Sequence, residues 1–498
     1  MRSMSEPISS SLPTRASGPG GVAGPGGVAR VRPARDLAGT VRVPGDKSIS
    51  HRAAMLAAAA GGRVTLEGYA PGRDAASTLA CLAALGVAVT RPAADRVVVE
   101  GPGIDGWQAP AAPLDAGNSG TTMRLLLGLL ATRPFAATLT GDASLCRRPM
   151  GRVVEPLRRM GAQIEGRDGG RRAPLRVRGG ALRGIHHDSP VASAQVKSAL
   201  LLAGLFAEGR TSVREPALSR DHTERMLPLF GVPVRRDDLT VAVEGGRPLR
   251  APARVSIPGD PSAAAFYLAA AVLCPGSRVV VPGVGVNPTR IGFLEVLEAM
   301  GARIRMRIRD EAASPAGDGP TGPVGEPVAD LIAEASDLRA VAVGGELIPR
   351  LIDEIPILAV LATQARGTTR IRDAAELRVK ETDRLRALAE ELRRLGARVD
   401  EHPDGLDVHG PTPLRGAACD ARGDHRMAMA LAVAGLAADG ETAIVGAACA
   451  AVSDPDFFVN LRRLGAAVDG PDDAAADAVR ATGTAADGAI QPEGSASP

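Results

Sequence analysis

Several segments of this chain place cationic side chains and small polar residues directly before an apolar run. In VPGDKSISHRAAM (43–55), a short strand and a Pro-Gly-Asp turn lead into a helix that begins near Ser48. Lys47, Ser48 and Arg52 would then surround a helix N-terminus, where free N–H groups and the helix dipole favour an anion. It is not a P-loop, because Asp46 stands where Walker A requires glycine. The segment predicts an anion site, or alternatively an exposed helix start with solvated charges.

Two further loops repeat this design. The loop AGNSGTT (116–122) leads into an apolar helix, where Asn118 can supply hydrogen bonds and Gly120 lets a ligand approach the backbone closely. Arg147 and Arg148 precede a proline in a turn that opens the next helix. The two arginines could clamp a carboxylate or phosphate, or they could be surface charge.

Polar residues also stand at the entrances of two later segments. They are Ser193, Gln195 and Lys197 in SPVASAQVKSALLLAGL (189–205), and Ser219, Arg220 and His222 in SRDHTERML (219–227). His222 lacks the partner spacing of a metal ligand, so we expect no metal site.

The second half of the chain supplies acidic residues next to cations. They are Asp353 and Glu354 in LIDEIPILAVLA (351–362), Glu381 in ELRVKETDRLRALAEEL (376–392), and Asp424 in GDHRMAMALAVAGL (423–436). Lys380 and Arg384 are four residues apart, which predicts one helix face with Glu381 beside it, although a salt-bridged surface helix is the plain alternative. The helix after Asp424 is almost wholly apolar, so we expect it to be buried and Arg426 at its mouth to face a cleft.

Composition narrows the class of protein. A chain of 498 residues with 45% apolar content predicts a globular protein of two or more domains. The longest apolar run (263–274) has 12 residues, well below the ~18–20 that span a bilayer, so we expect a soluble, cytoplasmic protein without membrane contact. The net charge of +3 and the 2% of aromatic residues argue against nucleic-acid binding. Five widely spaced cysteines fit neither a disulfide framework nor a zinc site.

The two ends differ from the rest of the chain. Residues 1–29 are rich in Gly, Pro and Ser, and residues 471–498 in Ala, Asp and Gly, so we expect disordered tails. The N-terminal segment lacks the amphipathic pattern of a transit peptide, which is the alternative.

A repeated element explains how these segments could be positioned. The pattern L-x-x-[LMF]-G-[AV]-x-[VI] occurs six times, with its glycines at 86, 161, 231, 301, 396 and 465. Each copy predicts an amphipathic helix end, a glycine C-cap and the start of a strand. One interval is longer because residues 311–327 interrupt it as a loop insertion. Six units of about 70 residues predict two similar α/β domains with a ligand cleft between them.

The segments resemble one family when taken together. PGDKSISHRA, GNSGTTMR, RRPMGR, SAQVKSALLLAGL, SRDHTERML, IDEIPI, RVKETDR and GDHRMAMA are similar, in this order across 34–466, to the 5-enolpyruvylshikimate-3-phosphate (EPSP) synthase family. The resemblance implies a two-domain inside-out α/β barrel with three βαβαββ units in each domain. It places residues 30–45 and 258–470 in the first domain and residues 46–257 in the second.

The resemblance also implies an activity. Family members transfer the enolpyruvyl group of phosphoenolpyruvate to the 5-hydroxyl of shikimate 3-phosphate and release phosphate, through a tetrahedral ketal and without a metal or organic cofactor. The implied shikimate 3-phosphate contacts are Lys47, Ser48, Arg52, Ser193, Ala194, Gln195, Ser219, Asp353 and Lys380. The implied phosphoenolpyruvate contacts are Lys47, Asn118, Gly120, Arg148, Gln195, Arg384 and Arg426. We expect these small molecules to be the only partners of a monomer.

Three residues would carry the proton transfers. By resemblance, Asp353 accepts the proton of the 5-hydroxyl, and Glu381 protonates the methylene carbon and later takes that proton back. Lysine occurs only at positions 47, 197 and 380, against 56 arginines, and unlike arginine it can give up a proton. We therefore expect Lys47 to protonate the departing phosphate.

The chain departs from the family pattern near its C-terminal end, where Val452 and Ser453 occupy about the place of a lysine that contacts phosphoenolpyruvate in some members. Two alternatives remain. UDP-N-acetylglucosamine enolpyruvyl transferase shares the fold and the donor, but it has Lys-Asn in place of Lys47-Ser48. A silent binding module would have no need of the acidic residues Asp353 and Glu381 among anions.

Overall fold

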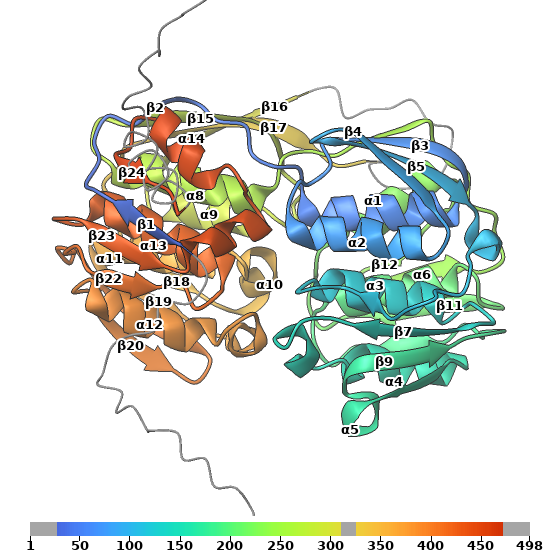
Figure 1. The fold of residues 1–498 in the computed structure, drawn as a ribbon. Helices are drawn as coiled ribbons and strands as arrows, with labels where there is room; N and C mark the ends of the chain where they lie inside the picture. The colour runs from blue at the N-terminus through green and yellow to red at the C-terminus, as the bar shows by residue number, and fades with distance from the viewer. Residues whose placement is uncertain (1–26, 310–324, 472–498) are drawn as a thin grey trace, which may run out of the picture.

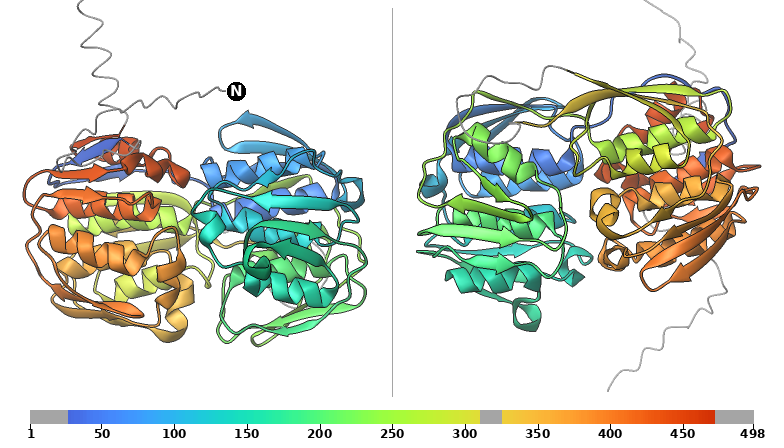
Figure 2. Two further views of the ribbon diagram at one scale, coloured as in Figure 1. Left: turned by 60° about the horizontal axis from the view of Figure 1, so that its bottom comes forward. Right: turned by 180° about the vertical axis from the view of Figure 1, so that it is seen from behind.

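The computed structural model describes residues 27–309 and 325–471, which form two α/β lobes lying side by side (Figures 1 and 2). Each lobe has its own hydrophobic core. The core of the central lobe draws on residues between Ile49 and Ile257. The core of the terminal lobe combines residues between Ala29 and Val41 with residues between Ala264 and Val468. Both ends of the described chain therefore belong to one lobe.

The repeating unit is clearest in the middle of the central lobe. Its elements are β6 (Leu114–Asp115), α3 (Gly120–Leu130), β7 (Ala136–Thr140), α4 (Gly151–Met160), β8 (Gln163–Gly166) and β9 (Arg172–Arg178). The sheet order is β6-β7-β9-β8, with β6 parallel to β7 and the other pairs antiparallel. Along β9 buried and exposed residues alternate, because one face covers the core and the other faces solvent. This is a βαβαββ unit, as predicted.

The same sheet order recurs in all six four-stranded sheets of the described residues. The second unit of the central lobe has β10 (His186–Asp188), α6 (Ala194–Gly204), β11 (Arg210–Arg214), α7 (His222–Met226), β12 (Arg235–Asp237) and β13 (Thr240–Glu244). The third has α1 (Lys47–Ala59), β3 (Gly61–Glu67), α2 (Arg73–Ala84), β4 (Ala88–Ala93) and β5 (Arg96–Pro102). Its first strand is β14 (Arg254–Ser256), which comes from the far end of the lobe and pairs in parallel with β3.

The terminal lobe also holds three units. One has β2 (Ala38–Thr40), α8 (Pro261–Leu273), β15 (Arg278–Gly285), α9 (Gly292–Ala299), β16 (Arg303–Ile308) and β17 (Val328–Glu334). Another has β18 (Ala342–Val343), α11 (Ile355–Gln364), β19 (Gly367–Ile371), α12 (Arg384–Arg394), β20 (Arg398–His402) and β21 (Gly405–Gly410). The last has β22 (Ala418–Asp420), α13 (His425–Ala437), β23 (Thr442–Val445), α14 (Phe457–Arg463) and β24 (Val468–Asp469), and the N-terminal strand β1 (Val28–Val31) completes its sheet.

Short helical segments fill several connections. They are α5 (Arg167–Gly170), α10 (Ile348–Leu351) and the 3₁₀ segments η1 (Ile104–Gly106), η2 (Leu145–Arg147), η3 (Leu227–Phe230), η5 (Gly345–Leu347), η6 (Ala375–Val379) and η7 (Ala447–Val452). The six glycines of the repeated sequence pattern all have positive φ, from 78° at Gly231 to 116° at Gly161. They end helical segments in the left-handed conformation that glycine adopts without steric cost, as the pattern predicts.

The most apolar helices lie inside the lobes and the sheets lie outside. In the central lobe these helices are α1, α3 and α6, and in the terminal lobe they are α8, α11 and α13. Nearly every residue of each is buried, because apolar and small side chains extend around most of each circumference. α3 packs on both α1 and α6, and α8, α11 and α13 pack on one another.

The chain passes between the lobes twice, before α1 and before α8. The two crossing segments meet at an antiparallel bridge between Gly45 and Gly259. A Cβ atom on Gly45 would lie 1.6 Å from the carbonyl oxygen of Gly68, so only glycine fits there. The backbone of Gly45 therefore packs tightly against Gly68, next to the point where the two crossing segments meet.

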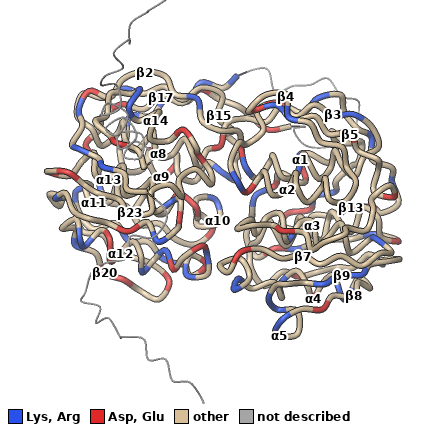
Figure 3. The backbone as a smooth tube through the Cα atoms, viewed as in Figure 1, with Lys and Arg blue, Asp and Glu red and all other residues tan. Residues whose placement is uncertain are grey.

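The expected tails and insertion lie largely outside the described residues. The structure describes neither residues 1–26 and 472–498 nor residues 310–324 of the insertion. The expected N-terminal tail of 1–29 extends too far, because Val28 and Ala29 already pair with β23. No helix within 27–309 or 325–471 is long and apolar enough to cross a membrane. Charges of both signs are scattered over both lobes (Figure 3).

Candidate active site

A cleft between the lobes collects the segments singled out in the sequence. Its cationic lining residues are Lys47, Arg124, Arg148, Arg152, Arg220, Arg290, Lys380 and Arg426, and its acidic ones are Asp74, Asp260, Asp353, Glu376 and Glu381. Residues at or next to the N-termini of α1, α3, α6, α8, α11 and α13 all line it. Six buried helices therefore direct the positive ends of their dipoles at one cleft, which favours anionic ligands.

Side chains at the helix starts hold this arrangement in place. Asp46, Ser119, Ser193, Asp260 and Asp424 cap α1, α3, α6, α8 and α13, and each accepts a hydrogen bond from a backbone N–H two or three residues later. Caps of this kind typically stabilise a helix by about 1 kcal/mol. The loops at the cleft are therefore pinned before any ligand enters.

Lys47 lies where the two lobes meet. Its Nζ is 2.8 Å from Asp74 Oδ2, and its backbone nitrogen donates to Asp260 Oδ2 at 3.1 Å. Arg52, one helical turn further, donates through Nη1 to the carbonyl oxygen of Ser48 at 2.8 Å. Ser48 and Lys47 both line the cleft, as the anion-site interpretation expected.

The two arginines before Pro149 have different environments. Arg147 is exposed, whereas Arg148 is buried, lines the cleft and donates through Nη2 to Asn118 Oδ1 at 2.5 Å. Nη1 of Arg148 lies 3.6 Å from Glu381 Oε1 in the terminal lobe. The expected two-arginine clamp therefore reduces to Arg148, with Asn118 holding its guanidinium.

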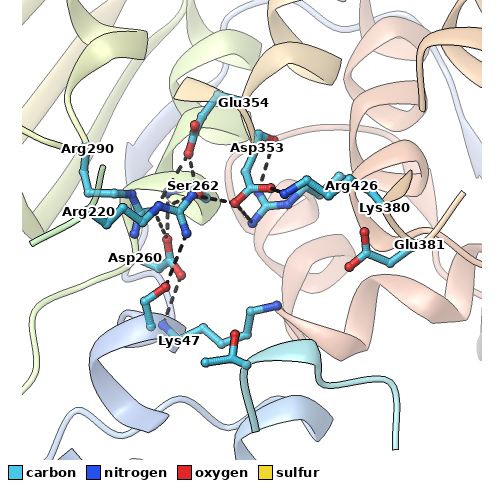
Figure 4. Close-up of polar contacts among 12 residues, drawn as sticks. Lys47, Arg220, Asp260, Ser262, Arg290, Asp353, Glu354, Lys380, Glu381 and Arg426 are labelled. Carbon is cyan, nitrogen blue, oxygen red and sulfur yellow. Dashed lines mark hydrogen bonds and ion pairs between the residues drawn. The ribbon is translucent and has the colours of Figure 1, made fainter. Parts of the chain in front are cut away.

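Asp353 stands among four cations, of which Arg220, Lys380 and Arg426 are labelled in Figure 4. The distances from its carboxylate oxygens are 2.5 Å to Arg220, 3.2 Å to Arg384, 3.7 Å to Lys380 and 3.8 Å to Arg426. Burial alone would raise the pKa of Asp353, but the four cations outweigh it and hold the pKa well below its usual range. Asp353 is therefore an ionised carboxylate in the cleft.

The neighbouring acid, Glu354, has a different environment. It is 1% exposed, accepts a short hydrogen bond from Ser262 and lies 3.9 Å from Arg290. Of the two consecutive acids, only Asp353 lines the cleft. The structure thus separates a residue that a substrate can reach from one that cannot be reached.

Glu381 is another acidic residue that lines the cleft. Its Oε2 accepts from Arg384 Nη2 at 2.6 Å. Burial would raise the pKa of Glu381, but Arg384 and Arg148 lower it well below its ordinary value. The expectation that Lys380 and Arg384 share a helix face is wrong, because α12 begins only at Arg384. Lys380 and Glu381 lie in the segment before this helix. Lys380 approaches Asp353 from that segment, and Arg384 approaches it from the first residue of the helix.

The site residues from SAQVKSALLLAGL and SRDHTERML lie together in the central lobe. Gln195 lines the cleft and accepts from Arg124 Nη1 at 2.6 Å. Ser193 also lines the cleft, and its backbone nitrogen donates to Glu215 at 2.8 Å. Ser219 Oγ donates to the same carboxylate at 2.7 Å. Glu215 therefore links the two segments.

Lys197 faces the interior instead of the cleft. It is 1% exposed, and its Nζ is 2.7 Å from Glu215 and 2.8 Å from Glu224. Burial would lower its pKa, but the two carboxylates raise it above the ordinary value. Lys197 is thus a charged structural residue that supports the segment carrying Ser193 and Ser219.

The cleft gathers most of the predicted site residues directly. Lys47, Ser48, Gly120, Arg148, Ser193, Gln195, Asp353, Lys380, Glu381 and Arg426 line it. Five predicted site residues do not line the cleft themselves. Arg52, Asn118 and Arg384 are hydrogen-bonded to the lining residues Ser48, Arg148 and Asp353, Ser219 is bonded to Glu215, and Ala194 lies between Ser193 and Gln195. Among the described residues, no group of three or more His, Cys, Asp or Glu side chains is arranged to hold a metal ion.

Sequence reasoning left several lining residues without a role. Arg124, Asp74, Asp260 and Arg290 were not singled out, and Arg220 was named without an assignment. Arg124 follows Gly120 by one helical turn, which is a signal that could have identified it. Burial and the nearby charge of Arg148 lower the pKa of Arg124 to about 10.

At Val452, where the chain departs from the family pattern, a backbone carbonyl group lies against the central lobe in place of a lysine side chain. A Cβ atom on Gly72 would lie 2.2 Å from the carbonyl oxygen of Val452, so η7 packs directly against the start of α2.

The fold and the cleft define an α/β protein of two lobes whose cleft, lined by helix N-termini and cations, is suited to anionic ligands. Comparisons with known proteins narrow this class. The model of the EPSP synthase (3-phosphoshikimate 1-carboxyvinyltransferase) family matches residues 31–461, and the chain belongs to this family.

Individual relatives agree with the family match. A 3-phosphoshikimate 1-carboxyvinyltransferase of Synechococcus sp. is 56% identical over 411 residues, which cover 82% of this chain and 89% of the relative. One of Brevibacillus brevis is 52% identical over 412 residues, covering 82% and 93%. The solved EPSP synthase of Acinetobacter baumannii has a TM-score of 0.78 and 39% identity, and the match covers 89% of this chain and 99% of that one.

Proposed function

We propose that this chain transfers the enolpyruvyl group of phosphoenolpyruvate to the 5-hydroxyl of shikimate 3-phosphate and releases phosphate. The observation that carries this proposal is the pair Asp353 and Glu381, two ionised carboxylates held among cations in a cleft built for anions. Family membership gives the substrates, and the cleft gives the charges that two polyanions require.

The reaction balances as an addition followed by an elimination. The acceptor oxygen bonds to C2 of phosphoenolpyruvate while a proton adds to C3, which gives a tetrahedral ketal. The bond from C2 to the phosphate oxygen then breaks, phosphate leaves, and the methyl group returns its proton. We propose that Asp353 takes the hydroxyl proton and that Glu381 gives and then retrieves the carbon-bound proton. Lys47 would protonate the departing phosphate.

Glu381 must carry a proton before it can act as an acid. In the ligand-free cleft Arg384 and Arg148 oppose this, because they hold its pKa low. The phosphate and carboxylate groups of the two substrates would engage the same cations and so raise the pKa of Glu381. Substrate binding would thus create the acid that the next step needs.

The substrate contacts are proposed as follows. Shikimate 3-phosphate would meet Lys47, Ser48, Arg52, Ser193, Ala194, Gln195, Ser219, Asp353 and Lys380. Phosphoenolpyruvate would meet Lys47, Asn118, Gly120, Arg148, Gln195, Arg384 and Arg426. Arg220 is 2.5 Å from Asp353 and joins this set as a further cation. The proposed reaction uses these residues without a metal or an organic cofactor.

We also propose that residues 30–45 with 258–470, and residues 46–257, act as two domains that close around the substrates in a monomer. Several contact residues would come from each side, so closure would complete the site.

Phosphate release is the direct test. The purified protein is incubated with phosphoenolpyruvate plus shikimate 3-phosphate, and in parallel with phosphoenolpyruvate plus UDP-N-acetylglucosamine. Release with the first pair alone supports the proposal. Release with the second pair supports the sister activity, which the family match does not favour, and release with neither from folded protein supports a silent binding module.

A further inference from the structure

Arg290 lies in the turn between β15 and α9, and its guanidinium reaches both segments by which the chain crosses between the lobes. Nη1 is 2.9 Å from Asp46 Oδ2, and Nη2 is 3.2 Å from Asp260 Oδ1. These carboxylates cap α1 of the central lobe and α8 of the terminal lobe. Arg290 is 2% exposed and Asp46 is 1% exposed, so salt screens this pair little. One side chain ties together the starts of two helices from different lobes.

The same guanidinium is connected to both sides of the catalytic cleft (Figure 4). Nη2 donates to Ser262 Oγ at 2.8 Å and lies 3.9 Å from Glu354 Oε1, in the residue after Asp353. On the other side, Asp260 Oδ2 accepts the backbone N–H of Lys47 at 3.1 Å. Arg290 is therefore linked to Lys47 through Asp260, and to Asp353 through the adjacent residue Glu354.

The turn that carries Arg290 makes a second contact with the central lobe. Asn287 Nδ2 donates to Asp221 Oδ1 at 2.7 Å, and both residues are buried. Asp221 directly follows Arg220, the cation 2.5 Å from Asp353. The turn 287–290 thus bridges the lobes at two points, neither of which uses a proposed substrate contact.

We propose that Arg290 is a positioning residue for the reaction: it binds Asp46, Asp260 and Glu354 in one buried cluster so that Lys47 and Asp353 stay in register across the cleft. This inference rests on the proposed function. Without Arg290, three buried carboxylates would lose their shared counter-charge. Lysine would replace it poorly, because a single ammonium cannot make the directed contacts of a planar guanidinium.

The test compares Arg290→Met and Arg290→Lys with Arg350→Met as a matched control. Arg350 donates to the carbonyl oxygen of Pro288 in the same turn, but its ion pair with Glu295 stays within the terminal lobe. For each variant, kcat and both KM values are measured, and calorimetry with shikimate 3-phosphate gives the number of intact sites and the Kd.

Arg290→Met should lower kcat about 100-fold, because misplacing reacting groups by about 1 Å has such an effect. Arg290→Lys should lower it about tenfold, and Arg350→Met should stay within twofold of wild type. The Kd of shikimate 3-phosphate should change less than about threefold at full stoichiometry, since its proposed contacts lie mainly in the central lobe. Adding Glu354→Gln to Arg290→Met should restore kcat at least about fivefold, because it removes a carboxylate left unpaired.

A merely structural role would lower the number of sites in proportion to kcat, and that result overturns the inference. So does a folded Arg290→Met that keeps kcat within threefold, or, where that variant does not fold, an Arg290→Lys with wild-type kcat. A wild-type protein that binds both substrates without turnover overturns the proposed function, and this inference with it.

Discussion

Replacing Asp353 with asparagine should change catalysis and anion binding in opposite directions. The carboxylate is surrounded by Arg220, Arg384, Lys380 and Arg426 at 2.5 to 3.8 Å, so it occupies cations that an anionic substrate must recruit. At an effective dielectric constant of 20, each unit charge pair at about 4 Å is worth roughly 4 kcal/mol. In Asp353→Asn these cations lose their carboxylate partner, so they are free to attract a substrate phosphate. A gain of about 1.4 kcal/mol in the binding free energy would lower the Kd about tenfold.

The same substitution removes the proposed base. Loss of general base catalysis typically lowers the rate ~10²- to 10⁴-fold, so Asp353→Asn should show a much lower kcat together with a lower Kd for shikimate 3-phosphate. Stopped-time phosphate assays give kcat, and calorimetry without phosphoenolpyruvate gives Kd. Asp105→Asn is the control, because Asp105 pairs with Arg133 on the surface of the central lobe and its side chain is 94% exposed. A folded Asp353→Asn with kcat within threefold of wild type, or with weaker anion binding, would refute the reasoning.

Three further perturbations test other parts of the argument. Lys47→Arg keeps the charge but cannot release a proton, so kcat should fall at least about tenfold with little change in KM; near-normal kcat in steady-state assays would exclude proton donation by Lys47. Lys197→Met leaves Glu215 and Glu224 unpaired in the core, so urea unfolding should show a loss of about 3–5 kcal/mol, and a loss below about 1 kcal/mol would contradict the buried ion-pair account. Burial lowers the pKa of His51 to about 3, so the unfolded state binds one more proton than the folded state between about pH 6.5 and 3, and stability falls as pH falls through this window. His51→Gln should reduce the slope of the unfolding free energy against pH by about 1.4 kcal/mol per pH unit between pH 6 and 4. An unchanged slope would count against a neutral buried His51.

The fold could be read from the sequence where its signals are local. The six glycines at helix ends require a left-handed backbone, and apolar runs after Asp46, Ser119 and Asp424 mark buried helices with capped starts. These features depend on residues within one or two turns of each other. They therefore predicted the number of units, and the apolar run after Asp424 also predicted that the start of its helix faces a cleft.

The exchange of strands could not be read in this way. β1 completes a sheet with β23 and β24 more than 400 residues later, and β14 opens the sheet that holds β3. Nothing in the short sequence VARV (28–31) distinguishes such a strand from the end of a tail. Pairing over this distance depends on the closure of the whole lobe, so the expected tail boundary was placed too late.

The orientation of Lys197 shows a second limit of local patterns. Gln195 and Lys197 are two residues apart in α6, which turns their side chains by about 200° from each other. Gln195 lines the cleft, so Lys197 points into the lobe, toward Glu215 and Glu224. The direction of Gln195 is set by Arg124 and Thr121 of α3, and the packing of α3 against α6 is not a local feature of the sequence. Partners such as Arg290 and Asp74 were missed for the same reason.

The three lysines share a feature that explains why this chain uses lysine at all. Each ammonium lies within 4 Å of at least one carboxylate: Lys47 at 2.8 Å from Asp74, Lys197 between Glu215 and Glu224, and Lys380 at 3.7 Å from Asp353. A guanidinium is planar and wide, and it directs its donors into a fork, whereas an ammonium is a compact point charge with three rotatable donors. The scarce lysines therefore lie where a small charge must fit, and only Lys47 and Lys380 of the three line the cleft. Proton donation is consequently a property to test at Lys47, while the geometry at Lys197 already accounts for lysine there without any catalytic role.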